Sequence, residues 1–107
     1  MALKPNMQKV GFEQLTVSTT ALGLTATKYA PNGQQDLNVA TFAVADVETN
    51  PIRYRDDGVP PTSSVGQPAS AGAQIQLVGV QAIRDFLAIR SGAADSTLEV
   101  SYYREGP

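Results

Sequence analysis

Short runs of alternating apolar and polar residues, each ended by turn-forming residues, recur along the whole chain. From Phe12 onward, Leu15 and Val17 alternate with polar neighbours, and the run from 22 to 27 places Leu, Leu and Ala against Gly, Thr and Thr. Side chains two residues apart lie on the same face of a strand, so these runs predict strands with one buried and one solvated face. The chain is therefore expected to be rich in β-structure.

The middle of the chain predicts two further strands and a tight connection between them. Residues 37–47 are apolar enough for a buried strand or a short helix, and their β-branched content favours a strand. A turn is expected at residues 48–51, where Asn-Pro occurs. Residues 52–55 alternate again and end at Asp-Asp-Gly, whose Gly58 can take a positive φ. Together these segments predict a hairpin.

The last third of the chain predicts a strand at residues 75–78 and a terminal strand in which Leu98, Val100 and Tyr102 share one face. Residues 82–90 fit both a helical and a strand spacing, and a short turn followed by a strand is the favoured interpretation.

Two segments contain too many polar or helix- and strand-breaking residues for regular structure. Residues 59–73 include three prolines and two glycines, and they predict a long loop that crosses between sheets. Residues 1–11 are polar without a sustained period, and they predict an N-terminal arm that either remains free or docks on a neighbouring subunit.

About seven short runs separated by turns are typical of an all-β protein, a small antiparallel β-sandwich. A chain of 107 residues folds as one domain, and 42% hydrophobic with 17% charged residues is a globular composition. We therefore expect the arm at residues 1–11 and a single β-sandwich domain at residues 12–107.

The composition also excludes classes of function. The chain has no cysteine and no histidine, which removes thiolate nucleophiles, zinc sites built on sulfur or imidazole, and the commonest general base. A formal net charge of -2 provides no cationic field for nucleic acid. No apolar run approaches the ~20 residues of a membrane span, and the N-terminus lacks the apolar core of a signal peptide. The chain is expected to be neither an enzyme nor a nucleic-acid-binding or membrane protein, to need no cofactor or metal, and to be made in the cytoplasm.

The most acidic segment is Asp56-Asp57-Gly58, which has two interpretations. With Asp36, Asp46 or Glu48 nearby in space it would bind Ca²⁺ through carboxylate oxygens. However, valine and two prolines follow and offer no side-chain oxygen, so a strand end and turn is favoured. A glycosidase pair is disfavoured because adjacent strand residues point to opposite faces, whereas the two carboxyl groups must face each other.

Aromatic and cationic residues alternate at Arg53, Tyr54 and Arg55. Ordinary strand alternation is the favoured interpretation, and an intersubunit contact is the other, because Arg and Tyr are enriched at interface hot spots. At the end of the chain, one of Tyr102 and Tyr103 is expected to point into the sandwich and the other outward, where it is a candidate contact residue.

Three segments of the second half also carry a resemblance. They are Ile52-Arg53-Tyr54-Arg55-Asp56-Asp57-Gly58-Val59-Pro60-Pro61-Thr62 followed by Gly66, then residues 82–89, and residues 98–104. This arrangement resembles small structural proteins encoded among the head genes of tailed bacteriophages. In such proteins the R-x-D-G-x-x-P-T segment looks like a strand, a turn and a crossover, so it is a signature of the fold and carries no chemistry.

The resemblance implies a virion component, a capsid decoration (cement) protein on the outer face of the major capsid protein shell. The implied partners are the major capsid protein and further copies of the chain, as a dimer or trimer on the shell. The alternatives are a tail, connector or baseplate module and a carbohydrate-binding module used in adsorption. Candidate contact residues are Leu3 and Met7 of the arm, with Arg53, Tyr54, Arg55 and Tyr103.

Overall fold

The computed structural model describes residues 7–31 and 39–105, which form eight strands and two very short helices. In chain order they are β1 (Met7–Val17), β2 (Leu22–Gly23), α1 (Ala26–Tyr29), β3 (Phe42–Glu48), β4 (Ile52–Arg55), β5 (Gln67–Ala69), β6 (Gln74–Val78), α2 (Val80–Asp85), β7 (Leu87–Arg90) and β8 (Ser96–Glu105).

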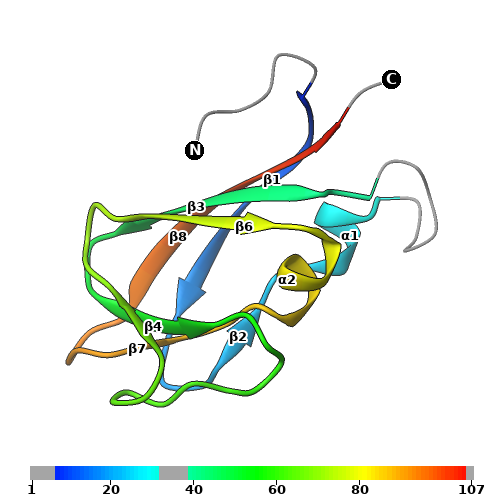
Figure 1. The fold of residues 1–107 in the computed structure, drawn as a ribbon. Coiled ribbons are helices and arrows are strands. Elements are labelled where there is room, and N and C mark those ends of the chain that lie inside the picture. Colours follow the sequence, from blue (N-terminus) through cyan, green and yellow to red (C-terminus); the bar gives the residue numbers. More distant parts are fainter. Residues whose placement is uncertain (1–6, 32–38, 106–107) are drawn as a thin grey trace.

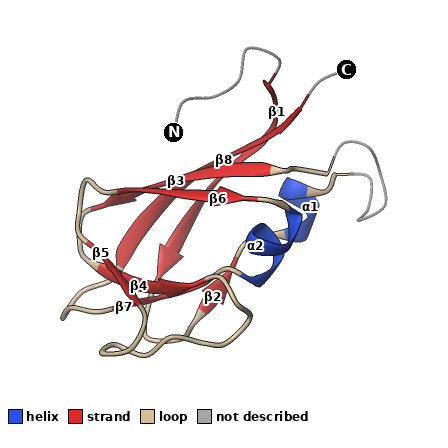
Figure 2. Cartoon of the chain, viewed as in Figure 1, coloured by secondary structure: helices blue, strands red, loops and turns tan. Residues whose placement is uncertain are grey.

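The strands form two antiparallel four-stranded sheets that pack face to face. Sheet A has the order β1-β8-β3-β6, and sheet B has the order β2-β7-β4-β5. Figure 1 shows sheet A as the upper layer and sheet B as the lower one. Both short helices lie at the same end of the two layers (Figure 2). The predicted all-β sandwich is therefore confirmed, with eight strands in the described residues where about seven were expected.

The core lies between the two sheets and follows from the alternation in the sequence. In β8, Leu98, Val100 and Tyr102 are buried, and their partners in β3, which are Val47, Ala45 and Ala43, are buried beside them. Sheet B contributes Ile52 and Ala88, which are fully buried, and α2 with the residue that follows it adds Ile83 and Phe86. Burying an aliphatic or aromatic side chain contributes about 1.5–3 kcal/mol, so this layer is the main source of stability.

The predicted hairpin between residues 37–47 and 52–55 is wrong. Strand β3 belongs to sheet A and β4 to sheet B, so the connection carries the chain from one layer to the other. Thr49 has a φ of 68° at this corner, and the buried Ser96 hydroxyl lies 2.6 Å from the Glu48 carbonyl oxygen and 2.5 Å from that of Asn50. The hydroxyl of a residue distant in sequence thus binds the backbone carbonyls of this corner. The local sequence pattern gives no indication of that contact.

Three local predictions also differ from the structure. The loop at residues 59–73 contains β5, which pairs with β4. The short turn predicted before the strand at residues 87–90 is the helix α2, whereas the strand itself is confirmed. The strand predicted over residues 22–27 is reduced to the two residues of β2, because α1 begins at Ala26.

The first described strand includes part of the predicted arm. Residues 7–11 belong to β1 and pair with β8, with a bulge between Lys9 and Gly11, while residues 1–6 lie outside the described residues. Gly11 is required by a close approach, because a Cβ atom there would lie 2.4 Å from the backbone oxygen of Lys28. Strand β1 and helix α1 therefore meet at a position where only glycine fits.

Candidate interaction surfaces

Arg53 binds the β4–β5 loop through two hydrogen bonds. Its Nε atom donates to the Ser63 carbonyl at 3.2 Å and its Nη1 atom to the Gly66 carbonyl at 2.9 Å. Gly66 packs closely here, since an added Cβ would lie 3.1 Å from Pro61 and from the Tyr54 carbonyl. The loop thus folds back on β4, and the guanidinium of Arg53 ties two of its carbonyls to that strand.

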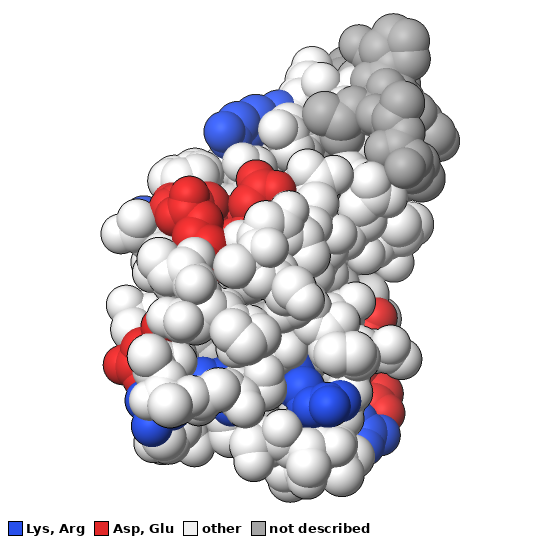
Figure 3. Space-filling model, turned by 90° about the vertical axis from the view of Figure 1, so that its left-hand side faces the viewer, with Lys and Arg blue, Asp and Glu red and all other residues white. Residues whose placement is uncertain are grey.

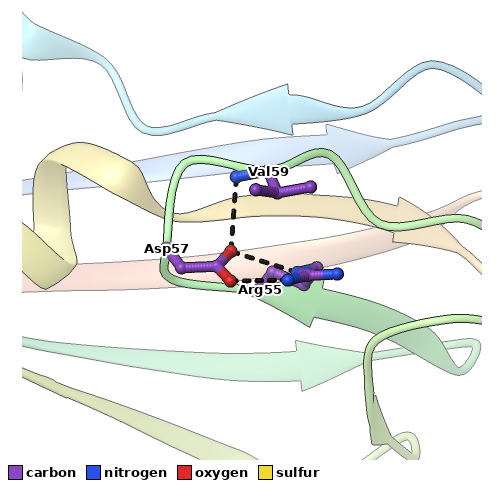
Figure 4. Close-up of polar contacts among 3 residues, drawn as sticks. All are labelled: Arg55, Asp57 and Val59. Atoms are coloured by element: carbon purple, nitrogen blue, oxygen red, sulfur yellow. Dashed lines mark hydrogen bonds and ion pairs between the residues drawn. The ribbon is translucent and has the colours of Figure 1, made fainter.

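Arg55 forms a forked contact with Asp57 at the turn that follows β4 (Figure 4). Its Nε and Nη2 atoms donate to the two carboxylate oxygens at 3.0 and 2.6 Å, and the Val59 amide donates to Asp57 at 3.3 Å. The Arg55 hydrogen bond is the main reason that the pKa of Asp57 falls to about 2. Both oxygens of Asp57 are therefore engaged in the turn, as the turn interpretation expected.

A titration tests this turn. The folded pKa of Asp57 lies below its ordinary value of 3.8, so the contact contributes stability that is fully present above pH 3.8 and is lost as the pH falls through about 2. We expect a carboxyl carbon titration by NMR to give a midpoint of about 2, and the Arg55→Gln variant to move that midpoint towards 3.8. An unchanged midpoint in the variant would show that Arg55 does not stabilise the carboxylate.

Tyr54 lies on sheet B and Tyr103 on sheet A, and neither side chain is fully exposed. Tyr54 is half-buried, with its ring centroid 5.6 Å from that of Phe86, and burial followed by the nearby Asp56 charge raises its pKa. Tyr103 is half-buried on the outer side of sheet A, 6.3 Å from the ring of Phe42. Tyr102 is fully buried, so the prediction that one of the two tyrosines points inward and the other outward is confirmed.

The two candidates in the arm have separate outcomes. Met7 is the first residue of β1, is partly buried and pairs with Glu105. Leu3 lies outside the described residues. The structure thus brings Arg53, Arg55 and Tyr54 together on β4 of sheet B, and it places Met7 and Tyr103 on sheet A.

A buried polar cluster at Glu13 was not predicted. The Glu13 carboxyl group is 8% exposed and accepts hydrogen bonds from the Tyr102 hydroxyl, from the Thr25 hydroxyl at 2.6 Å and from the Thr25 amide at 3.0 Å. Burial is the main reason that the pKa of Tyr102 lies far above its ordinary value, and the Glu13 hydrogen bond adds to it. Glu13 is in phase with Leu15 and Val17, so its alternation was the signal that could have identified it as inward-facing. The cluster joins β1, β8 and the residue that precedes α1.

The outer side of sheet A carries exposed apolar residues that sequence reasoning also missed. Phe12 of β1 is 48% exposed and Val78 of β6 is 63% exposed. Between them in the sheet lie Tyr103 and Val44, each half-buried. Figure 3 views the molecule from the left-hand side of Figure 1, so it shows an end of the sandwich and not the outer side of sheet A, and the charged side chains at this end lie in small groups. Apolar side chains gathered on one face are a common feature of protein-binding surfaces.

Two hollows lie beside the β4–β5 loop. One, of about 340 Å³, is lined by Arg55, Asp56, Asp57, Gly66 and Gln67, and the other, of about 460 Å³, by Thr19, Pro61, Thr62, Ser63, Ile89, Arg90 and Gly92. Arg90 is paired with Asp95 at 2.8 Å. Within residues 7–31 and 39–105 no group of three or more acidic side chains is placed to hold a metal ion, and no helix has the length and hydropathy to cross a membrane.

Comparison with protein-family models, curated proteins and solved structures finds no match to this chain.

Proposed function

We propose that this chain is a virion structural protein, a capsid decoration protein that binds the outer face of a major capsid protein shell and stabilises the head. The observation that carries the proposal is the exposed apolar side of sheet A, where Phe12 and Val78 face solvent on a sheet that is otherwise closely packed. Exposed apolar side chains of this kind favour binding to another protein, because the removal of apolar surface from water lowers the free energy.

The segments that carry the resemblance support the proposal. Residues 52–62 form a strand, a turn and the start of a loop. Arg55 donates to Asp57 within this unit, and Arg53 donates to carbonyls of the loop that follows it. This is the behaviour expected of a fold signature. It also moves the expected capsid contacts away from Arg53 and Arg55 and towards the side of sheet A that includes Tyr103.

The proposed mechanism is stabilisation by binding. A ligand that binds only the assembled state stabilises that state by RT ln(1 + [L]/Kd), so each bound copy adds to the stability of the shell. Many copies that bridge neighbouring shell subunits repeat this modest contribution over the whole lattice. Met7 and Leu3 of the predicted arm are the proposed contacts with neighbouring copies in a dimer or trimer on the shell, and the virion surface is the proposed location.

One observation favours a second candidate, a tail, connector or baseplate module. Strand β1 is eleven residues long and lies at the edge of sheet A. A long edge strand can pair with a strand of another chain, and repeated pairing of this kind builds rings. A ring of the free chain in sedimentation velocity would favour this candidate.

Sedimentation with phage heads assembled without this protein tests the proposal. We expect the full chain to pellet with the heads at a fixed ratio to the major capsid protein and to raise the temperature at which the heads disrupt. Heads already saturated with the protein are the control, because they should take up no further copies. If the chain stays in the supernatant at micromolar concentration, the decoration function is wrong.

A further inference from the structure

The outer side of sheet A has a defined composition that follows from strand register. Leu98, Val100 and Tyr102 point into the core, so the residues that alternate with them in β8 point outward, as do their direct partners on neighbouring strands. We call these residues the sheet A outer face: Lys9, Phe12, Gln14 and Thr16 of β1, Thr97, Glu99, Ser101 and Tyr103 of β8, Phe42, Val44, Asp46 and Glu48 of β3, and Gln74, Gln76 and Val78 of β6.

The face is divided into an apolar end and an acidic end. At the apolar end, Tyr103, Phe42 and Val78 lie in one row across β8, β3 and β6, and Lys9 of β1 continues the row beside Tyr103. Val78 is exposed and Tyr103 half-buried, whereas Phe42 is only 2% exposed and offers almost no accessible surface. Two residues further along the strands come Ser101, Val44 and Gln76, and after them Glu99, Asp46 and Gln74. The face therefore changes from aromatic and aliphatic to acidic over a few residues.

The acidic end contains an unfavourable pair. Asp46 and Glu99 are direct partners in the β3–β8 register, and like charges directly opposite each other destabilise a sheet. Their hydrogen-bond donors are neutral amides, Gln74 to Asp46 at 3.2 Å and Gln14 to Glu99 at 2.8 Å. The ion pairs found among the described residues are Arg55–Asp57 and Arg90–Asp95, so no salt bridge there neutralises Asp46 or Glu99.

The charge of the face identifies its partner. Among the described residues of the face, Asp46, Glu48 and Glu99 are accompanied by one cation, Lys9, whose ammonium lies 5.2 Å from the centre of the Phe12 ring. A surface of the same composition would bring carboxylates together, which is unfavourable at an interface. A surface with Lys or Arg beside apolar side chains would relieve the Asp46–Glu99 repulsion and cover Phe12 and Val78 at the same time.

The size of the face also argues against a simple pair of copies. The four strands of sheet A are 11, 10, 7 and 5 residues long. With strands about 4.8 Å apart and about 3.4 Å per residue, they give a planar area of roughly 500 Å². A stable protein–protein interface buries about 800 Å² on each partner, so this face alone is too small for a lasting dimer. It suits a contact that is weak for one copy and is repeated many times on a larger assembly.

We propose that the sheet A outer face docks on a protein surface that presents Lys or Arg side chains next to apolar ones. This inference rests on the proposed function, in which that surface belongs to the assembled shell. The Asp46–Glu99 pair lowers the stability of the free chain and strengthens docking. Removing one of these charges should therefore change folding and binding in opposite directions.

Neutralising variants of the full chain test the charge argument on heads assembled without this protein. We expect Asp46→Asn and Glu99→Gln each to weaken head binding about tenfold, while the melting temperature of the free chain stays the same or rises. Head binding of the wild type should weaken with added salt, and that of Asp46→Asn should weaken less. Asp56→Asn, which neutralises an exposed aspartate outside the face, is the control and should bind as the wild type does.

A second pair of variants tests the apolar end. Val78→Asp should abolish co-sedimentation, whereas Val65→Asp should not, because Val65 is 53% exposed in the β4–β5 loop and lies outside the face. If the wild type binds heads and all three face variants bind equally well, the inference is wrong while the proposed function stands. If the wild type does not bind, the proposed function is wrong and this inference fails with it. If the free chain is a dimer that Val78→Asp dissociates, the occupant is a second copy and the inference is overturned.

Discussion

Replacing Glu13 with alanine is expected to lower the free energy of unfolding by about 3 kcal/mol, because several buried hydrogen bonds to one carboxyl group are lost together. The Tyr102 hydroxyl is fully buried and loses its acceptor, and Thr25 loses the acceptor for both its amide and its hydroxyl. For a domain of this size such a loss lowers the melting temperature by roughly 10–20 °C. Thermal and urea denaturation of the free chain measure it.

The neighbouring Gln14→Ala variant is the matched control. Gln14 is exposed and makes one surface hydrogen bond, to Glu99, so its loss should change stability by less than about 0.5 kcal/mol. Tyr102→Phe removes only the hydroxyl, and the double variant Glu13→Ala/Tyr102→Phe should cost less than the sum of the two single changes, since both act on one hydrogen bond. Strictly additive effects, or a Glu13→Ala variant as stable as Gln14→Ala, would contradict the role assigned to the cluster.

The alternation of side chains predicted the layer structure well, because a two-residue period follows directly from strand geometry. It predicted strands at residues 52–55 and 98–102 and the opposite directions of Tyr102 and Tyr103, and the structure confirms all of these. These predictions needed no information about which strand pairs with which.

Pairing could not be predicted in the same way. The corner after β3 depends on Ser96, which lies 46 and 48 residues from its two carbonyl partners. A turn signal at residues 48–51 is the same whether the next strand returns to its own sheet or crosses to the other. The contacts that decide between these outcomes lie outside any local window, so the hairpin prediction was wrong for a physical reason.

The candidate surfaces show the same limit. Arg53 resembled an interface residue, but its acceptors are carbonyls in a loop ten to thirteen residues away. Phe12 belongs to a residue type that is usually buried, but its phase with Gln14, opposite to that of Leu15, directs it to solvent. In both cases the residue type suggested one environment, and the register or the loop path created another.

Replacing Gly11 with alanine is expected to lower the free energy of unfolding by about 2–3 kcal/mol, the usual cost of forcing an extra group into a closely packed site. The added Cβ atom would lie 2.4 Å from the Lys28 backbone oxygen, so β1 and α1 must move apart. A destabilising effect is unusual for this change. Glycine-to-alanine substitutions at compatible positions stabilise a protein by about 0.4–1 kcal/mol, because they reduce the conformational entropy of the unfolded chain.

The Gly92→Ala variant separates the steric effect at Gly11 from the entropic effect on the unfolded chain. A Cβ atom at Gly92 would meet Pro51 no closer than 3.6 Å, an ordinary contact, so this variant should be as stable as the wild type or slightly more stable. Chemical denaturation of the two variants side by side measures the difference, and amide exchange should show lost protection at α1 only in Gly11→Ala. If both variants are equally stable, the close approach of β1 to α1 does not constrain the fold. If Gly11→Ala alone is destabilised, the close approach at Gly11 fixes the position of β1. The same strand supplies the exposed Phe12 ring to the sheet A outer face and the buried Glu13 carboxyl group to the core.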